Sequence, residues 1–498
     1  MLQQGIPLPK GLEAPPESVL VSVMPQETKV AFYENNELCE FHIERNFSLN
    51  TVGNIYLGKV KRILPGMQSA FVDIGLERAA FLHFVDLVEN RVSPENPQRI
   101  EKIIFEGQSI LVQVIKEPIG NKGARVTTQI SLVGRHLVFL PQDNHIGVSQ
   151  RIETEEQKAI LRKKLESIIP NNHQGGFIVR TKASEATVEE LEADLIFLDR
   201  FWKEIKSQSI LRSSPSLIFK DLSLALRLLR DFVGSNTQKI LVDSLVTFQE
   251  MRSFAESYCP IVLNKIFYFE NNNEVDLFSF YHVDYKKALY PRVDLKGGGY
   301  LIIESTESMT TIDVNTGGFV GANNFQSTIY QTNLEACQVV ARELRLRNIG
   351  GIIIVDFIDM EDKVHRAKVL QELAYYLSFD KTKVTLNGFT ALGLVELTRK
   401  RTRSSLKNAL TERCMHCGGY GYIKSIQTVC YEIMHLIYNE VNKFGYQSIK
   451  VVASSDVIEC LLDEESLPLL RLCEALQTKI TLVVGNEFER EDYELFAV

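Results

Sequence analysis

The stretches Met309-Thr-Thr-Ile-Asp-Val-Asn315 and Gly350-Gly-Ile-Ile-Ile-Val-Asp356 decide the fold, because each is a β-branched apolar run with an aspartate at or near its end. Between them, residues from about Ser327 to Arg347 have helical periodicity. Strand, helix and strand in this order predict a right-handed parallel crossover that sets Asp313 and Asp356 side by side. Ligands of open α/β sheets gather at such carboxyl ends, so this edge is the first candidate site.

The residues at this edge are those of a metal site. Carboxylate and amide oxygens are hard ligands that suit Mg²⁺, or Mn²⁺ in its place. Asp313 and Asp356 supply two carboxylates, and Asn315 follows on the same strand face. Such a metal activates water and neutralises charge on a phosphate, which favours phosphodiester hydrolysis. The alternative is that both acids cap the loops that follow. Asp359 is interpreted as a supporting or capping residue.

The composition indicates several domains and no membrane span. The chain has 498 residues and a net charge of −8, from 55 Lys plus Arg and 63 Asp plus Glu, so any contact with nucleic acid must be local. The longest apolar runs fall well short of the roughly 20 residues that cross a bilayer. Residues 1–17 lack a secretory signal and are expected to form a flexible leader. We therefore expect a cytoplasmic protein.

The rest of the chain divides into β-rich and mixed segments. Closely spaced strands from Val52 to about Ile130 predict a small barrel of the OB type, and an α+β module follows it. Four basic residues then stand behind an apolar run, namely Arg399, Lys400, Arg401 and Arg403. They are interpreted either as a phosphate-holding cluster or as a solvated helix end.

The segment Cys414-Met-His-Cys417-Gly-Gly is half of a zinc ribbon, because the two-residue spacer lets both thiolates reach one ion. Tetrahedral closure needs two more ligands. A second subunit across a two-fold axis would supply the same pair again. The alternatives are completion by Cys430 with His416, or a redox dithiol without metal.

Read in sequence order, these features resemble the ribonuclease E/G family of bacterial endoribonucleases, from about Ser18 to near the C-terminus. The Asn-Thr-Gly-Gly-Phe-Val-Gly version of the aspartate motif is closer to the ribonuclease G branch of that family. The stretches that carry the resemblance are Asn54-Ile-Tyr-Leu-Gly-Lys-Val-Lys-Arg-Ile, Ala70-Phe-Val-Asp-Ile-Gly, Gly120-Asn-Lys-Gly-Ala, Thr311-Ile-Asp-Val-Asn-Thr-Gly-Gly-Phe-Val-Gly, Thr332-Asn-Leu-Glu-Ala, Leu344-Arg-Leu-Arg-Asn-Ile-Gly-Gly, Val355-Asp-Phe-Ile-Asp-Met and Cys414-Met-His-Cys417.

The resemblance implies a multidomain α/β fold with a β-barrel. An RNase H-like fold is expected to be split by insertion of the OB-type RNA-binding barrel and a 5′-sensor domain. A DNase I-like catalytic domain, a zinc link and a small α/β C-terminal domain would follow. The expected bounds are 18–49 with 220–289 for the RNase H-like domain, 50–130 for the barrel, 131–219 for the sensor, 290–408 for the catalytic domain, 409–424 for the zinc link and 425–498 for the small domain.

The resemblance also assigns roles to single residues. Asp313 and Asp356 would bind Mg²⁺ with Asn315 as a hydrogen-bonding partner, and Cys414 and Cys417 would share Zn²⁺ between the subunits of a homodimer or tetramer. RNA would contact Phe71, Phe81 and Lys122 of the barrel, although without the family both rings would be interpreted as barrel core. The 5′-monophosphate pocket would comprise Gly134, Val138, Arg180, Thr181 and Lys383, where lysine replaces the family's arginine and loses its bidentate fork.

The activity implied is a Mg²⁺-dependent endoribonuclease that cuts single-stranded RNA to 5′-phosphate and 3′-hydroxyl ends. Stimulation by a 5′-monophosphate, maturation of the 16S rRNA 5′ end and decay of mRNA belong to the same expectation. The rival interpretations are a non-catalytic RNA-binding regulator and a metal-dependent DNA nuclease.

Overall fold

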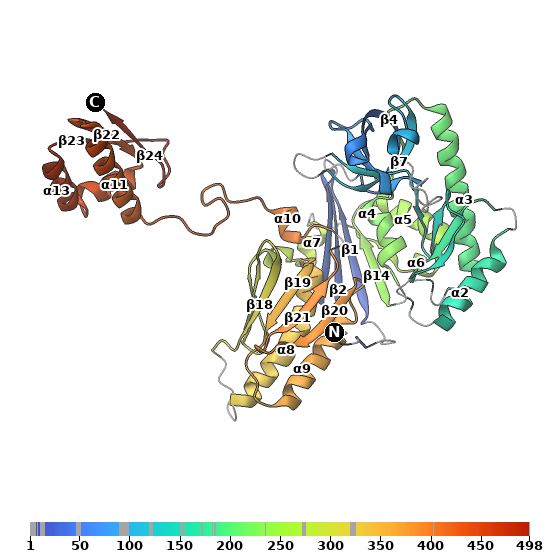
Figure 1. The fold of residues 1–498 in the computed structure, drawn as a ribbon. Helices are drawn as coiled ribbons and strands as arrows, with labels where there is room; N and C mark the ends of the chain where they lie inside the picture. The colour runs from blue at the N-terminus through green and yellow to red at the C-terminus, as the bar shows by residue number, and fades with distance from the viewer. Residues whose placement is uncertain are drawn as a thin grey trace. The chain divides into compact units, whose positions relative to one another are not determined.

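The computed structural model describes residues 6, 8–9, 15–45, 51–88, 99–118, 123–149, 152, 155–170, 173–181, 183, 186–234, 236–270, 275–318, 325–401 and 403–497 (Figure 1). The chain forms two compact units, Met1–Lys407 and Asn408–Val498, and each is described by itself. Within the described ranges, four sheets lie in the first unit and one in the second.

The sheet that carries the aspartates has six strands in the order β16-β17-β18-β19-β21-β20. Only β18 and β19 run parallel, joined by helix α8, so the predicted strand-helix-strand crossover is confirmed. The other neighbours are antiparallel. The bounds are β16 Arg292–Asp294, β17 Tyr300–Ser305, β18 Met309–Asn315, α8 Phe325–Leu346, β19 Gly351–Asp356, α9 Lys363–Leu377, β20 Val384–Phe389 and β21 Val395–Arg399.

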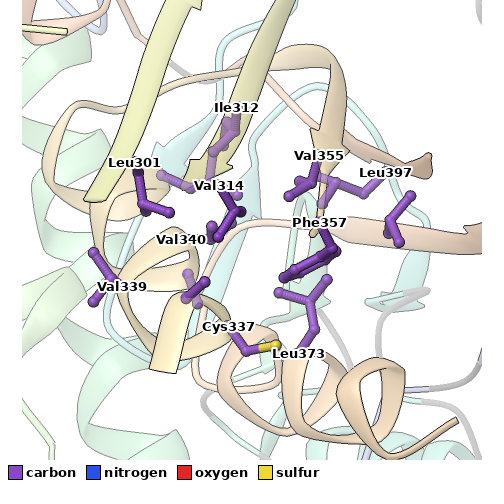
Figure 2. Close-up of a cluster of buried hydrophobic side chains, with 14 of the residues drawn as sticks. Leu301, Ile312, Val314, Cys337, Val339, Val340, Val355, Phe357, Leu373 and Leu397 are labelled. Atoms are coloured by element: carbon purple, nitrogen blue, oxygen red, sulfur yellow. The ribbon is translucent and has the colours of Figure 1, made fainter. Parts of the chain in front are cut away.

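Helices α8 and α9 cover one face of this sheet. Alternate strand residues such as Ile312, Val314 and Val355 are buried against them, and Val340 and Leu373 pack from the helices (Figure 2). Because side chains alternate across a strand, the residues between these face the opposite side. The burial pattern therefore leaves the second face of the sheet open near its carboxyl end.

A second sheet of five strands is built from two distant parts of the chain, in the order β15-β14-β1-β2-β3. Strands β1 and β14 pair in parallel and join the two parts. The barrel and the four-stranded module are inserted between β3 and β14 (Figure 1). The bounds are β1 Glu17–Val23, β2 Glu27–Glu34, β3 Glu37–Arg45, α4 Leu224–Arg227, β14 Thr237–Val242, α5 Leu245–Tyr258, α6 Pro260–Leu263, β15 Ile266–Tyr268 and α7 Leu277–Phe280.

The predicted barrel is present and closed, because β4 pairs with both β5 and β7. Its five strands are β4 Ile55–Leu64, β5 Ser69–Asp73, β6 Ala80–His83, β7 Ser109–Lys116 and β8 Arg125–Thr127. Strand β13 (Ser216–Phe219) adds antiparallel to β4. Residues 216–219, expected in the sensor domain, pair through their backbone with the barrel, while Ile218 and Phe219 pack against the core of the module that follows it.

The module after the barrel has a sheet in the order β11-β12-β10-β9, with helices α2 and α3 beside it. The long α3 begins with a capping box, in which the Thr187 side chain accepts from the Glu190 backbone and the Glu190 side chain accepts from Thr187. The bounds are β9 Leu132–Val133, β10 Leu137–Leu140, β11 Ile146–Val148, α2 Glu155–Ile168, β12 Gly176–Val179 and α3 Val188–Leu211.

The second unit is a small α/β domain with sheet order β23-β22-β24. Its core lies between this sheet and the amphipathic helix α11. The bounds are α11 Ile426–Phe444, β22 Ser448–Ala453, α12 Ser455–Leu462, α13 Ser466–Leu476, β23 Lys479–Val484 and β24 Tyr493–Ala497. None of the described helices is long and apolar enough to cross a bilayer.

Two further expectations need correction. Within the predicted leader, Ile6 forms a bridge to Leu386 of β20 and packs with Leu8 against the core of the sheet that carries the aspartates. This part of the leader is therefore docked, since apolar side chains gain by burial. The apolar run before Arg399 is the strand β21 and not a helix, because Val395 and Leu397 alternate with outward residues.

Candidate active site

The register of β18 and β19 places Asp313 directly beside Asp356. Neighbouring strands lie about 4.8 Å apart, so the two carboxylates start from adjacent backbone positions. Both residues are exposed, and the residues next to them, Ile312, Val314 and Val355, are buried. Asp313 and Asp356 therefore project together from the open face, opposite α8 and α9.

Hydrogen bonding and charge tie this edge together. The Asn315 Nδ2 donates to Asp313 Oδ2 at 2.8 Å, which orients the carboxylate. Partial burial, and then the charges of Asp313 and Asp359, raise the pKa of Asp356 above its ordinary value. A divalent cation would remove this like-charge repulsion, so the donor set of two carboxylates and an amide fits Mg²⁺.

Asp359 is neither the cap of helix α9 nor the third member of a metal-ligand group. Helix α9 is capped by Asp362, whose side chain accepts from Val364 N at 2.8 Å, so Asp359 is not its cap. Within the described part of the chain, no group of three His, Cys, Asp or Glu side chains is arranged to hold a metal ion. The described geometry thus offers a pair of carboxylates, and Mg²⁺ commonly completes its shell with water.

The two barrel phenylalanines that were expected to contact RNA lie outside the core. Phe71 is 36% exposed and Phe81 is half-buried, whereas Ala70, Val72 and Leu82 fill the interior, so the alternative interpretation as barrel core is wrong. The two rings face each other across β5 and β6, with centroids 6.1 Å apart. Such a pair can stack on unpaired bases.

Sequence reasoning missed two arginines in the same row of strands. Arg62 of β4 lies opposite Phe71, and Arg125 of β8 lies opposite Phe81. In this row Arg62 is exposed beside the stacking surface of the two phenylalanines, whereas Arg125 pairs with Asp86 at 2.8 Å. The cross-strand register could not be derived from the sequence, because β4 and β7 contain bulges. Lys122 lies outside the described residues.

Three of the five predicted sensor residues meet in the four-stranded module. The Arg180 guanidinium donates to the carbonyl oxygens of Gly134 and Arg135, and Thr181 lies next to it with its Oγ1 3.2 Å from Ser149 Oγ. Gly134 has no room for a side chain, because a Cβ there would lie 2.5 Å from the buried Asp194 carboxylate. Val138 is half-buried in the adjoining strand β10.

The Arg180 fork is already engaged by an acid that sequence reasoning missed. Arg180 Nη2 lies 2.8 Å from Asp231 Oδ1, and Arg230 donates to the other oxygen of the same carboxylate. Although burial opposes it, the two guanidinium groups lower the pKa of Asp231. Lys383 is exposed on the loop before β20, and the neighbouring Lys381 Nζ donates to Phe232 O at 3.2 Å. The loop of Lys383 therefore touches the segment that pairs with Arg180.

The four basic residues between Arg399 and Arg403 differ in burial and in hydrogen-bond partners. Arg399 is buried and its Nε donates to Asp380 at 2.6 Å, with further bonds to Asn348 and the Ile349 carbonyl. Arg403 donates to Phe41 O at 3.2 Å. Arg399 is therefore structural, whereas Lys400, Arg401 and Arg403 are exposed, and Arg401 Nε donates to Gly350 O at 3.0 Å.

In the second unit, the cysteine pair lies in a glycine-rich turn, and Gly421 N donates to Cys417 Sγ at 3.4 Å. The backbone N–H groups of Gly421 and Gly419, and then Cys414, lower the pKa of Cys417 and favour the thiolate. Cys430 is fully buried in α11, and His416 Nδ1 is 3.2 Å from Glu489 Oε2. Completion by Cys430 and His416 is therefore wrong, because the described residues bring no third ligand to the pair.

Comparison with known proteins gives consistent matches. The sequence profile described as "Ribonuclease E/G family" matches residues 131–402, and the one described as "RNase E/G, Thioredoxin-like domain" matches residues 413–498. The chain is 47% identical to ribonuclease G of Haemophilus influenzae over 95% of this chain and 98% of that protein.

Two other relatives show how the identity differs between ribonuclease G and ribonuclease E proteins. Ribonuclease G of Escherichia coli K12 is 45% identical over 90% of this chain and 93% of its own length. Ribonuclease E of Synechocystis sp. is 38% identical over 75% of this chain but only 55% of its own length. The match to the ribonuclease G proteins is thus both higher in identity and nearly end to end.

Proposed function

The chain belongs to the ribonuclease E/G family and is an endoribonuclease of RNA processing, and we propose that it cuts single-stranded RNA with Mg²⁺ held by Asp313 and Asp356. The observation that carries this proposal is the pairing of the two acids in register on the open face of parallel strands. Asn315 steadies the Asp313 carboxylate from the same strand. Mn²⁺ suits the same donors.

The acidic edge and the barrel have different roles in the proposed hydrolysis. Mg²⁺ bound here would supply a water of lowered pKa and would offset charge on the scissile phosphate. Asp313 and Asp356 fix the position of that charge, while Phe71 and Phe81 hold unpaired bases by stacking. Water oxygen bonds to phosphorus, the bond from phosphorus to the 3′ oxygen breaks, and the 3′ oxygen takes the proton. The products are a 5′-phosphate and a 3′-hydroxyl end.

The experiment that tests this assignment is cleavage of a 5′-monophosphorylated single-stranded RNA with Mg²⁺ by the wild type and Asp356→Asn. We expect the variant to lose turnover. The matched control is Asp294→Asn, which removes an exposed acid from the edge strand of the same sheet and should cut normally. Equal turnover by Asp356→Asn would remove Asp356 from the site, and DNA cleavage that matches RNA cleavage would favour the DNA nuclease.

The 5′ end of the substrate is proposed to bind at Arg180, with Thr181, Gly134, Val138 and Lys383 around it. Supporting this, Arg180 lies beside Gly134 and the loop of Lys383 touches the segment that follows Asp231. A terminal phosphate would have to displace or share the Asp231 contact, which makes the stimulation by a 5′-monophosphate sensitive to that ion pair. Faster cleavage of 5′-monophosphate than of 5′-hydroxyl RNA is the expected result.

We also propose a structural Zn²⁺ held by Cys414 and Cys417 from two chains, which gives a homodimer or a pair of dimers. The backbone N–H groups at Cys417 favour the thiolate, which is the form that binds metal. Replacing both cysteines with serine should release zinc and produce monomers in light scattering. A variant that remains dimeric with full zinc would contradict the shared site. Precursor 16S rRNA and mRNA in the cytoplasm are the proposed substrates.

A further inference from the structure

We infer that Asn333 is a positioning residue for Asp356, because its side chain fixes the backbone immediately beyond that carboxylate. This inference rests on the proposed role of Asp356 in binding the metal. Asn333 lies on α8, is fully buried and faces the loop between β19 and α9. Nothing in the metal site itself requires a buried amide there.

The contact is a double hydrogen bond to one residue. Asn333 Nδ2 donates to Ile358 O at 2.8 Å, and Ile358 N donates to Asn333 Oδ1 at 3.1 Å. Ile358 follows Asp356 by two residues and precedes Asp359 by one. The two hydrogen bonds therefore determine the direction in which the chain leaves β19. They also set the position of Asp356 relative to Asp359.

The chemistry of the contact explains why an amide is needed. Ile358 has left the strand ladder, so its N–H and C=O need new partners when they are partly buried. A primary amide presents a donor and an acceptor side by side and can satisfy both at once. An apolar side chain of the same size would leave both groups unpaired, and the loop would then move to find water.

The neighbouring residues of α8 hold the other chain segments at this edge. Glu335 accepts from Gly297 N at 3.0 Å, and Thr332 packs where a Cβ on Gly299 would lie 3.0 Å from its methyl group and 2.6 Å from Asn315 O. The same turn of α8 thus touches the segment beside Asn315 and the segment beyond Asp356. Helix α8 sets the spacing of the two halves of the metal site.

The far end of α8 gives this helix a rigid support. Arg345 is buried and donates to Glu34 and Glu40 of the β2-β3 hairpin, and Arg342 is paired with Glu37. Ion pairs that are buried and multiply bonded fix geometry more than they add stability. Asn333 therefore acts from a helix that is anchored independently of the loop it holds.

The test compares metal binding by the RNA-free full chain with cleavage. Asn333→Leu keeps the side-chain size and removes both hydrogen bonds. Mn²⁺ binding is followed by electron paramagnetic resonance, and the Mg²⁺ dependence of cleavage is measured on a 5′-monophosphorylated RNA. We expect the Mn²⁺ dissociation constant and the half-saturating Mg²⁺ concentration both to rise about tenfold or more, as for other residues that orient metal ligands.

The control is Val340→Ala, a fully buried position two turns further along α8 that packs only in the core. It should lower the unfolding temperature and leave both metal constants unchanged, which separates positioning from general loss of stability. If Asn333→Leu does not accumulate as folded protein, Asn333→Ser is used, which admits a bridging water and should give a smaller shift in the same direction.

The outcomes separate this inference from the proposed function. Asp356→Asn that still binds Mn²⁺ like the wild type would overturn the metal site itself. Loss of Mn²⁺ binding in Asp356→Asn, together with wild-type binding in Asn333→Leu, would overturn only the positioning role. A shift in Asn333→Leu that Val340→Ala matches would also count against it.

Discussion

The acidic edge of the catalytic sheet and the proposed 5′-phosphate pocket around Arg180 place charge in opposite ways. At the edge, Asp313 and Asp356 stand side by side, and partial burial, followed by the charges of Asp313 and Asp359, raises the pKa of Asp356. In the pocket, Arg180 is already paired with Asp231 at 2.8 Å. One site brings like charges together and the other pairs opposite charges.

This difference teaches how each site should respond to its ligand. The edge gains from any divalent cation, since binding relieves an unfavourable interaction present in the free protein. The pocket must exchange an existing ion pair for a new one, so its net gain is smaller. We therefore expect the acidic edge to control whether cleavage happens and the pocket to modulate how fast a given RNA is cut.

The largest effect should come from replacing one aspartate of the acidic edge with lysine. Asp313→Lys places an ammonium group beside Asp356 and should reduce cleavage on the order of 10³-fold, because the metal-binding charge is lost. Initial rates on single-stranded RNA measure this. The control, Glu304→Lys, makes the same charge change on the same open face, one strand away. Similar losses in both variants would mean that only the net charge of the face matters.

A smaller effect should follow from breaking the Arg180 fork. Arg180→Lys keeps the positive charge but loses the planar donor pair, and the preference for 5′-monophosphate over 5′-hydroxyl RNA should fall about tenfold. Cleavage of the 5′-hydroxyl RNA should stay the same. Arg162→Lys on the exposed side of α2 is the control. An unchanged preference would separate 5′-end recognition from Arg180.

The acidic edge should also show itself through pH. The pKa of Asp356 is raised in the folded chain, so the folded state binds a proton at this carboxylate more tightly than the unfolded state does. The sign follows directly: without metal, wild type should gain stability relative to Asp356→Asn as the pH is lowered through the raised pKa of this group, and lose it as the pH rises. Thermal unfolding of both proteins in chelator between pH 4 and about 7 measures this. If the unfolding temperatures of the two proteins change with pH in parallel, the pKa of Asp356 is not raised by folding.

The smallest effect concerns Lys383. Lys383→Arg supplies a second planar fork next to the Arg180 pocket, and the 5′-monophosphate preference should rise about twofold to threefold. Lys400→Arg, an exposed position near Lys383 in the antiparallel pairing, is the control. The ratio of cleavage rates on the two RNA ends is the measurement, and a fall in this ratio would place Lys383 outside the pocket.

Much of the catalytic edge could be predicted because it depends on local signals. The β-branched runs that end near Asp313 and Asp356, with a helix between them, were sufficient to predict two parallel neighbours, and the register confirms it. The barrel strands followed from their spacing in the same way. The two phenylalanines were harder, since alternation alone does not say which side of a closed barrel is the inside.

The errors and omissions come from contacts between residues that are distant in sequence. Asp231 is 51 residues from Arg180, and Asn333 reads as one more polar position in an amphipathic helix. Arg399 is expected either in a phosphate-holding cluster or at a solvated helix end, but it is buried at the end of β21 and pairs with Asp380. Tertiary partners of this kind decide the role of a charged residue, and no local pattern records them.

The split five-stranded sheet has a consequence for how the chain is made. Strand β1 ends at Val23, and its parallel neighbour β14 begins at Thr237. At a ribosome speed of about 5 to 20 residues per second, the first three strands wait roughly 10 to 40 s for that neighbour. During this interval the barrel can close while β1 still has an unpaired edge. Slower synthesis of the inserted region should therefore increase the demand for chaperones at the nascent N-terminal hairpins.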